Sequence, residues 1–153
     1  MRLKKIIKQL EGKFPLELAE EWDNVGLLLD STRREIKSIM LCLDITRDVV
    51  DKAVANKVDL IISHHPFIFS PLKKITTDEV NGEKILKLAR NNIAVYSMHT
   101  NIDSGIGGLN DFIIKKIGQE GKVFAISNNR SIELRKLVTS DLIDAKDKII
   151  NPL

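Results

Sequence analysis

The three histidines of the chain are the residues best suited to chemistry, and each one follows an apolar stretch. His64 and His65 come directly after "DLIIS", and His99 ends "IAVYSMH". Two adjacent imidazoles are costly to protonate together, but both can bind a divalent metal ion in their neutral forms. Asp103 adds a carboxylate, and such a mixed nitrogen and oxygen set suits zinc, manganese or iron. These residues predict a metal site held by His64, His65 and Asp103.

Two further residues are expected beside that site. Asp44 ends the apolar segment "IMLCLD" and could accept an N–H from an imidazole that binds the metal. His99 is the candidate catalytic residue, because it could accept or donate a proton or orient Asp103. Taken singly, each residue has a plainer explanation, since a lone histidine is often structural and a lone aspartate often caps a turn or helix. Their joint placement favours the metal site.

The elements that carry these residues alternate along the chain. Apolar strands are expected at 36–44, 59–63 and 93–99, with helices at 47–57 and 81–92 between them. Such alternation predicts an α/β fold with a mostly parallel or mixed sheet and helices on both of its faces. Functional groups gather at the carboxyl ends of strands in this kind of sheet, and all three histidines fall at such ends.

The turn after the second of these strands must bring two neighbouring rings together. Neighbours in a regular strand point to opposite faces, but Pro66 fixes a turn and biases His65 toward an extended backbone. Both rings can then enter one cleft. The run "GIGG" after Asp103 is expected to leave the mouth of that cleft open. A phosphate-binding loop is a weak alternative for this run, because it lacks the G-x-G-x-x-G spacing and the lysine of a P-loop.

The remaining segments complete the expected fold. Thr46 is predicted to cap a helix, Asn91 or Asn92 to end one, and Trp22 to be a packing anchor or, alternatively, a wall of the cleft. A short apolar strand is expected after the turn residues Asp23 and Asn24. Further helices are expected at 2–12, 15–22 and 109–118.

Composition narrows the class of protein. The chain has 153 residues, 43% of them hydrophobic and 29% charged, which suits one soluble domain with a real core. It has no apolar run long enough to span a bilayer and no signal-peptide pattern, although a basic transit peptide is a weak alternative. Cys42 is the single cysteine and suits a core position in a reducing cytoplasm. The net charge of +3 is scattered and aromatics are few, which argues against nucleic-acid binding.

Three segments, "EEWDNVGLLLD", "DLIISHHPFIF" and "SMHTNIDSGIGGLND", together resemble the Nif-three-like dinuclear metal-centre family. Many of its members are labelled GTP cyclohydrolase one, type two homologues. The resemblance covers residues 1 to about 118. It implies a cytoplasmic homo-hexameric ring with two divalent metals in each subunit's cleft. It also implies His64, His65 and Asp103 as ligands, with His99 among or beside them, and metal-assisted attack of water on a purine nucleotide.

The carboxyl-terminal part departs from that family, so residues 1–118 are predicted to be the metal-binding domain and 119–153 a divergent or truncated tail. Family members are longer and carry a further histidine and a glutamate, whereas this chain has no histidine after His99. A fragment or truncated product is favoured; ligands from another chain, or a degraded site with one weakly bound metal, are the alternatives. The expected function is therefore a metal-binding protein resembling a hydrolase. The alternative is a non-catalytic protein-binding scaffold with a vestigial site.

Overall fold

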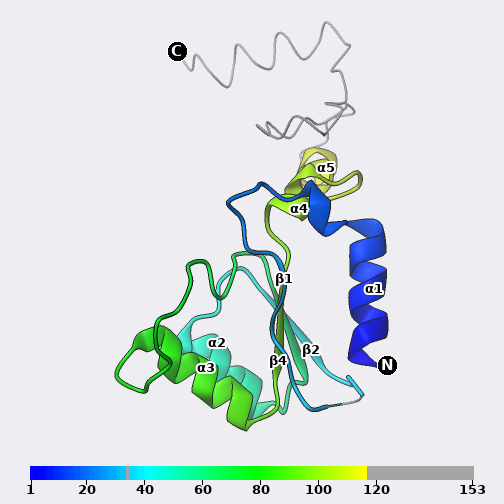
Figure 1. Cartoon of the computed structure of the whole chain (residues 1–153). Helices are drawn as coiled ribbons and strands as arrows, with labels where there is room; N and C mark the ends of the chain where they lie inside the picture. The colour runs from blue at the N-terminus through cyan, green and yellow to red at the C-terminus, as the bar shows by residue number, and fades with distance from the viewer. Residues whose placement is uncertain (34, 117–153) are drawn as a thin grey trace, which may run out of the picture.

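A four-stranded mixed sheet lies at the centre of the computed structural model, which describes residues 1–33 and 35–116 (Figure 1). The strands are β1 (Gly26–Leu29), β2 (Ile39–Cys42), β3 (Leu60–Ser63) and β4 (Ala94–Ser97), and they lie in the order β1-β4-β3-β2. β2, β3 and β4 are parallel, as the strand and helix alternation predicted, whereas β1 pairs antiparallel with β4. The predicted mixed α/β sheet is confirmed.

Helices cover both faces of this sheet, as expected (Figure 1). α2 (Arg47–Ala55) and α3 (Val80–Arg90) are the crossovers between the parallel strands and lie together on one face. α1 (Leu3–Lys13) lies on the other face. α4 (Thr100–Ser104) and α5 (Leu109–Lys116) follow β4 beyond the end of the sheet. That end is where the chain leaves each parallel strand, so α4 borders the rim where the predicted site residues lie.

Two apolar layers, one on each face, hold the strands in position. Leu60 and Tyr96 are completely buried on the α1 side of the sheet, and full burial of one such side chain stabilises a fold by roughly 1.5–3 kcal/mol. The α1 layer also contains Leu3, Ile6, Phe14, Ile36, Ala94 and Met98. The layer under α2 and α3 contains Ile45, Val50, Ala53, Val58, Ile61, Phe67, Ile85, Leu88, Ile93 and Val95, with Cys42 packed against it.

The ends of the crossover helices follow the local chemistry of the sequence. The side-chain oxygen of Thr46 accepts the N–H of Val49 at 3.2 Å, which confirms the predicted cap of α2. Asn91 is the residue that closes α3, and Asn92 adopts a left-handed backbone with φ of 53°. Asparagine tolerates that conformation better than most residues do, which confirms the predicted stop.

The helix predicted for residues 15–22 is wrong. Only Leu16–Leu18 form a single 3₁₀ turn, labelled η1, and the chain is extended at Ala19. The N–H of Glu20 donates to Thr100 Oγ1 at 3.0 Å instead of continuing a helix. This long-range hydrogen bond draws the segment toward the end of β4, where its following residues reach the site.

No helix within residues 1–33 and 35–116 combines the length and apolar character that crossing a bilayer requires. The tail predicted at 119–153 and the predicted helix end at Gly118 lie outside the described residues.

Candidate metal centre

The chain leaves β3 through a turn that carries both adjacent histidines. The N–H of His64 donates to the carbonyl of Cys42 at 3.1 Å, and the N–H of His65 donates to that of Leu43 at 3.0 Å. Successive N–H groups of a regular strand point to opposite sides, so two successive bonds to the same neighbour mean that the regular strand ends here. This change of direction explains how neighbouring rings reach one site.

Two buried serines fix that turn. The hydroxyl of Ser63 lies 2.9 Å from the carbonyl of His65 and 2.8 Å from the hydroxyl of Ser97. A hydroxyl has one hydrogen, and the carbonyl can only accept it, so Ser97 donates to Ser63. The oxygen of Ser97 in turn accepts the N–H of Phe67 at 3.4 Å. The network ties the ends of β3 and β4 together, and sequence reasoning missed it because serine at a strand end carries no distinctive signal.

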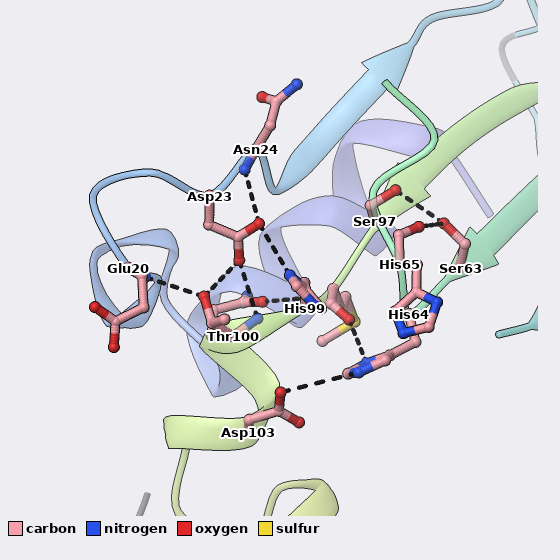
Figure 2. A network of polar contacts seen from close by, with 12 residues as sticks. Glu20, Asp23, Asn24, Ser63, His64, His65, Ser97, His99, Thr100 and Asp103 are labelled. Carbon is pink, nitrogen blue, oxygen red and sulfur yellow. Dashed lines mark hydrogen bonds and ion pairs between the residues drawn. The ribbon is translucent and has the colours of Figure 1, made fainter. Parts of the chain in front are cut away.

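The three imidazole rings lie beside one another at this rim (Figure 2). The ring centroids of His64 and His65 are 5.1 Å apart, those of His64 and His99 are 5.1 Å apart, and those of His65 and His99 are 5.6 Å apart. One nitrogen from each ring lies within 4.8 Å of the nitrogens offered by the other two. The cluster could therefore hold a metal ion.

The adjacent histidines are each oriented by a hydrogen bond at Nδ1. In His64 this atom lies 3.0 Å from the carbonyl oxygen of Met98, and in His65 it lies 2.7 Å from Oδ1 of Asp44. A carbonyl and an ionised carboxylate can only accept, so Nδ1 of each neutral ring carries the proton. The lone pair is then on Nε2, which is free for a metal. Asp44 takes the place that the sequence predicted for it.

His99 is oriented in the same way by Asp23, which the sequence analysis regarded only as a turn residue. Nδ1 of His99 lies 3.0 Å from Oδ1 of Asp23, and Oδ2 of Asp23 accepts the N–H and the hydroxyl of Thr100 (Figure 2). Burial raises the pKa of Asp23, but the hydrogen bonds from Thr100, His99 and Asn24 outweigh it, so the pKa is lowered overall. An ionised Asp23 leaves the lone pair of His99 on Nε2, as in the other two rings.

Asp103, the predicted carboxylate ligand, stands at the edge of the cluster. Its Oδ2 lies 3.9 Å from Nε2 of His64, which is too long for a hydrogen bond but close enough for a shared cation. Burial is the main cause that raises the pKa of Asp103; the charge of Asp23 adds to it, and the three imidazoles act in the opposite direction. A raised pKa means that the charged form is poorly stabilised, and a nearby cation would stabilise it.

The segment after His99 begins as the short helix α4. Asn101 fixes its position with a completely buried side chain. Its Oδ1 accepts the N–H of His99 at 3.0 Å, and its Nδ2 donates to the carbonyl of Phe14 at 3.1 Å. Asn101 thus links the site to the end of α1, a role that the sequence analysis did not assign to it.

Two of the glycines after Asp103, Gly105 and Gly108, have a packing role. A Cβ on Gly108 would lie 1.9 Å from the carbonyl oxygen of Ile102, and one on Gly105 would lie 2.5 Å from the ring of Phe14. Both distances are far below van der Waals contact. These positions therefore require glycine so that the turn between α4 and α5 can close.

Trp22 lies at the rim of the site and is not the packing anchor that was predicted first. Its side chain is 59% exposed, its ring centroid is 6.1 Å from that of Phe69, and it meets His99 edge-on with 6.2 Å between centroids. An indole beside the histidine cluster fits the alternative prediction, a wall of the cleft.

A cavity of about 570 Å³ opens on the His65 side of the cluster. Its lining includes Asp44 and His65, and Lys84 of α3 contributes an ammonium group. Volumes of this size accommodate small-molecule ligands. The histidine cluster therefore has a space beside it in which a ligand could be held.

The fold and the histidine cluster define a class of mixed α/β proteins with solved relatives. One is a Bacillus cereus protein related to NIF3, with a TM-score of 0.75 and 39% identity, matched over 82% of this chain and 35% of that one. Another is reduced HcgD from Methanocaldococcus jannaschii, with a TM-score of 0.73 and 34% identity, matched over 82% of this chain and 51% of that one. The model of the family described as Duf34/NIF3 (NGG1p interacting factor 3) matches residues 1–147, and the chain belongs to this family.

Curated relatives agree with this assignment. A "GTP cyclohydrolase 1 type 2 homolog" of Clostridium acetobutylicum is 38% identical over 133 residues, which are 87% of this chain and 50% of the relative. "NIF3-like protein 1" of Drosophila melanogaster is 42% identical over 117 residues, which are 76% of this chain and 40% of the relative. The chain thus spans about half the length of these relatives, or less.

Proposed function

We propose that the chain is a divalent-metal-binding protein whose site supports hydrolysis of a nucleotide. The observation that carries the proposal is the common orientation of the three histidines. Each Nδ1 is hydrogen-bonded to an acceptor, so each ring keeps its Nε2 lone pair for a cation. Two such nitrogens beside a carboxylate suit zinc, manganese or iron, and the third nitrogen is available to accept a proton.

His64, His65 and Asp103 would hold the ion, one or two per subunit. When bound, a divalent metal ion acts as a Lewis acid and lowers the pKa of a coordinated water toward about 7. His65 and His64 are held rigidly by Asp44 and by the Met98 carbonyl, which favours binding because little order must be gained.

His99 would move the proton. Its Nε2 has the lone pair that can accept a proton from a water molecule at the cluster, and the buried carboxylate of Asp23 would stabilise the resulting imidazolium. Asp23 is then a positioning residue, which acts through His99. Should His99 prove to be a third nitrogen ligand instead, its removal would lower metal content as well as turnover.

The substrate class comes from the relatives. Several carry the name "GTP cyclohydrolase 1 type 2 homolog", and a purine nucleotide is accordingly the substrate that we propose to test first. Metal-assisted attack of water on the purine ring is the corresponding reaction. A homo-oligomer, such as the hexamer that the family resemblance implies, belongs to the same proposal and is checked by sedimentation velocity.

The decisive experiment combines metal content with turnover. Elemental analysis after loading with zinc or manganese should give a bound metal in the unchanged protein and a clear loss in His64→Ala and Asp103→Ala. Asp78→Ala, an exposed carboxylate just before α3 that pairs with Lys74, is the matched control and should retain the metal. Equal metal in all samples would reject the ligand assignment.

Turnover is measured on the same samples with GTP. Product formation that a chelator abolishes, and that His99→Ala reduces at unchanged metal content, supports the hydrolase. Bound metal without any product would instead support the alternative in which the protein is a binding scaffold.

A further inference from the structure

The lining of the cavity beside His65 has a polar part and an apolar part. Asp44 and His65 adjoin the candidate metal site, Thr46 caps α2, and Asn81 and Lys84 belong to α3. The rest of the wall is the mainly apolar loop after the histidines: Pro66, Phe67, Ile68, Phe69, Ser70, Pro71 and Leu72. A ligand that fills the cavity would therefore meet a catalytic end, a donor-rich side and an apolar side.

We propose that this cavity binds a phosphate ester of a planar ring, with its phosphate at Lys84 and its ring between the apolar loop and the histidine cluster. The inference rests on the proposed function, because it places the substrate of that same site. It goes further by assigning the phosphate-binding residues and the direction in which the substrate lies.

Lys84 supplies the positive charge. Its ammonium group donates one hydrogen bond, at 2.8 Å, to the carbonyl of Ile45, and it lies 5.3 Å from the ring centroid of Phe67. An ammonium has three N–H donors, and the Ile45 carbonyl is its one hydrogen-bond acceptor among the residues that the structure describes. The carbonyl and the ring hold the amine in place, while its other donors are free for a phosphate.

Both crossover helices present their amino-terminal ends to the same space. Thr46 is the cap residue of α2, and Asn81 lies in the first turn of α3. The side chain of Glu79, which precedes α3, makes no capping hydrogen bond, so the first N–H groups of this helix have no side-chain acceptor there. The positive ends of two helix dipoles add to the charge of Lys84, and together they favour an anion.

The single carboxylate in the lining does not oppose this arrangement. Asp44 directs Oδ1 to Nδ1 of His65 at 2.7 Å, so its charge faces the histidine cluster. A cation bound there would offset that charge further. The negative group of the ligand is thereby expected at Lys84 and not at this carboxylate.

The apolar loop suits the ring. Phe69 is 54% exposed and packs at 6.1 Å, centroid to centroid, against Trp22, which in turn meets His99. Phe69 lines the cavity, and Trp22 lies between Phe69 and His99. A planar ring lying along these side chains could stack on Phe69 and reach the cluster.

The test is calorimetric titration of the full chain with guanosine monophosphate, guanosine and inorganic phosphate, with a chelator present. We expect the monophosphate to bind at least about tenfold more tightly than guanosine, because a charge-assisted hydrogen bond contributes that much or more. Lys84→Gln should remove this advantage and leave guanosine binding unchanged. Lys87→Gln is the matched control, since this lysine lies one turn further along α3, pairs with Asp51 and is not part of the lining.

A second variant tests the phosphate site independently if Lys84→Gln does not fold. Asn81→Asp places an acid in the first turn of α3, which favours the helix through its dipole but repels a phosphate. We expect it to weaken the monophosphate at least about tenfold while preserving helical circular dichroism.

Several outcomes would overturn the inference. They are the absence of saturable monophosphate binding, guanosine binding as tight as that of the monophosphate, and equal effects of the Lys84 and Lys87 substitutions. Because these titrations contain no free metal, they can fail while metal content and turnover succeed. Failure of the phosphate site and failure of the proposed hydrolase are thus separable.

Discussion

Nδ1 of His99 lies 3.0 Å from Oδ1 of Asp23, a carboxylate whose side chain is completely buried. The two residues are far apart in sequence, and they meet because antiparallel β1 begins where parallel β4 ends: Gly26 pairs with Ser97. Asp23 precedes one strand and His99 follows the other. The contact fixes the proton of His99 on the side that faces away from the cluster.

Replacing Asp23 by asparagine should therefore disturb the orientation of His99 while all three histidines remain in the site. Loss of an oriented partner of this kind typically lowers metal affinity or activity about 10- to 100-fold. We expect a loss of that size, together with a shift of the His99 proton toward Nε2 that ¹⁵N NMR of the imidazoles can detect. Asp48→Asn, which alters an exposed ion pair with Lys52 on α2, is the control and should change neither readout.

The second prediction concerns the contribution of Ser63 and Ser97 to the stability of the fold. Ser97→Ala removes the donor to Ser63 and the acceptor for the Phe67 N–H, both of them buried. Leaving such groups unpaired costs about 1–3 kcal/mol, and we expect the free energy of unfolding in urea to fall by that amount. Ser70→Ala, in the exposed part of the following loop, should change it by less than about 0.5 kcal/mol. A Ser97→Ala protein as stable as the unchanged one would show that the network is not structurally important.

The third prediction concerns Gly108 and the packing of α4 against α5. The carbonyl of Ile102 lies where a Cβ would stand, so Gly108→Ala must move α4 relative to α5. Strain of this kind costs about 1–3 kcal/mol, and α4 carries Asp103, so both thermal stability and metal affinity should fall. Gly12→Ala is the comparison, because a Cβ there meets nothing within 4 Å and alanine favours the helix. The measurement is the thermal unfolding midpoint of each variant. Equal changes in the two midpoints would contradict the packing role of Gly108.

Asp59 gives the pH dependence of the fold, away from the site. Burial raises the pKa of Asp59, but N–H donors of Lys37 and Ser38 and the charges of Arg33 and Lys37 outweigh it, so its pKa lies below the ordinary 3.8. A folded-state pKa below the unfolded one gives stability that is present above pH 3.8 and is lost as the pH falls through the folded value.

The Asp59→Asn variant should lose this part of the acid sensitivity. At neutral pH we expect it to be less stable by about 1–3 kcal/mol, because the negative charge that two N–H groups and Arg33 stabilise is removed. Between pH 4 and 2 its free energy of unfolding should fall less steeply than that of the unchanged protein. Parallel urea titrations across this range are the measurement, and identical slopes would assign the acid sensitivity to other groups.

The alternation of apolar segments was sufficient to predict the parallel part of the sheet. Strands of β-branched residues separated by amphipathic helices have few alternative arrangements, and His64, His65 and His99 fall at one rim as a direct result. Thr46 and Asn91 were predictable for a similar reason, because their side chains act on the backbone next to them.

Asp23 and Asn101 could not be found in this way. Asp23 reaches His99 through the antiparallel pairing of β1, and no local pattern specifies which strand β1 joins. The helix predicted for 15–22 failed for the same reason, since a hydrogen bond between Glu20 and Thr100 outweighed local propensity. Local sequence patterns do not predict such long-range contacts, because these contacts form only in the assembled fold.

Every strand of the sheet delivers a polar group to one rim. Asp44 follows β2, the adjacent histidines follow β3, His99 follows β4, and Asp23 precedes β1. An ion held there would cross-link segments from near residue 23 to beyond residue 100. Its arrival would restrain fraying at both edges of the sheet at once, so occupancy of the centre and rigidity of the domain would rise together.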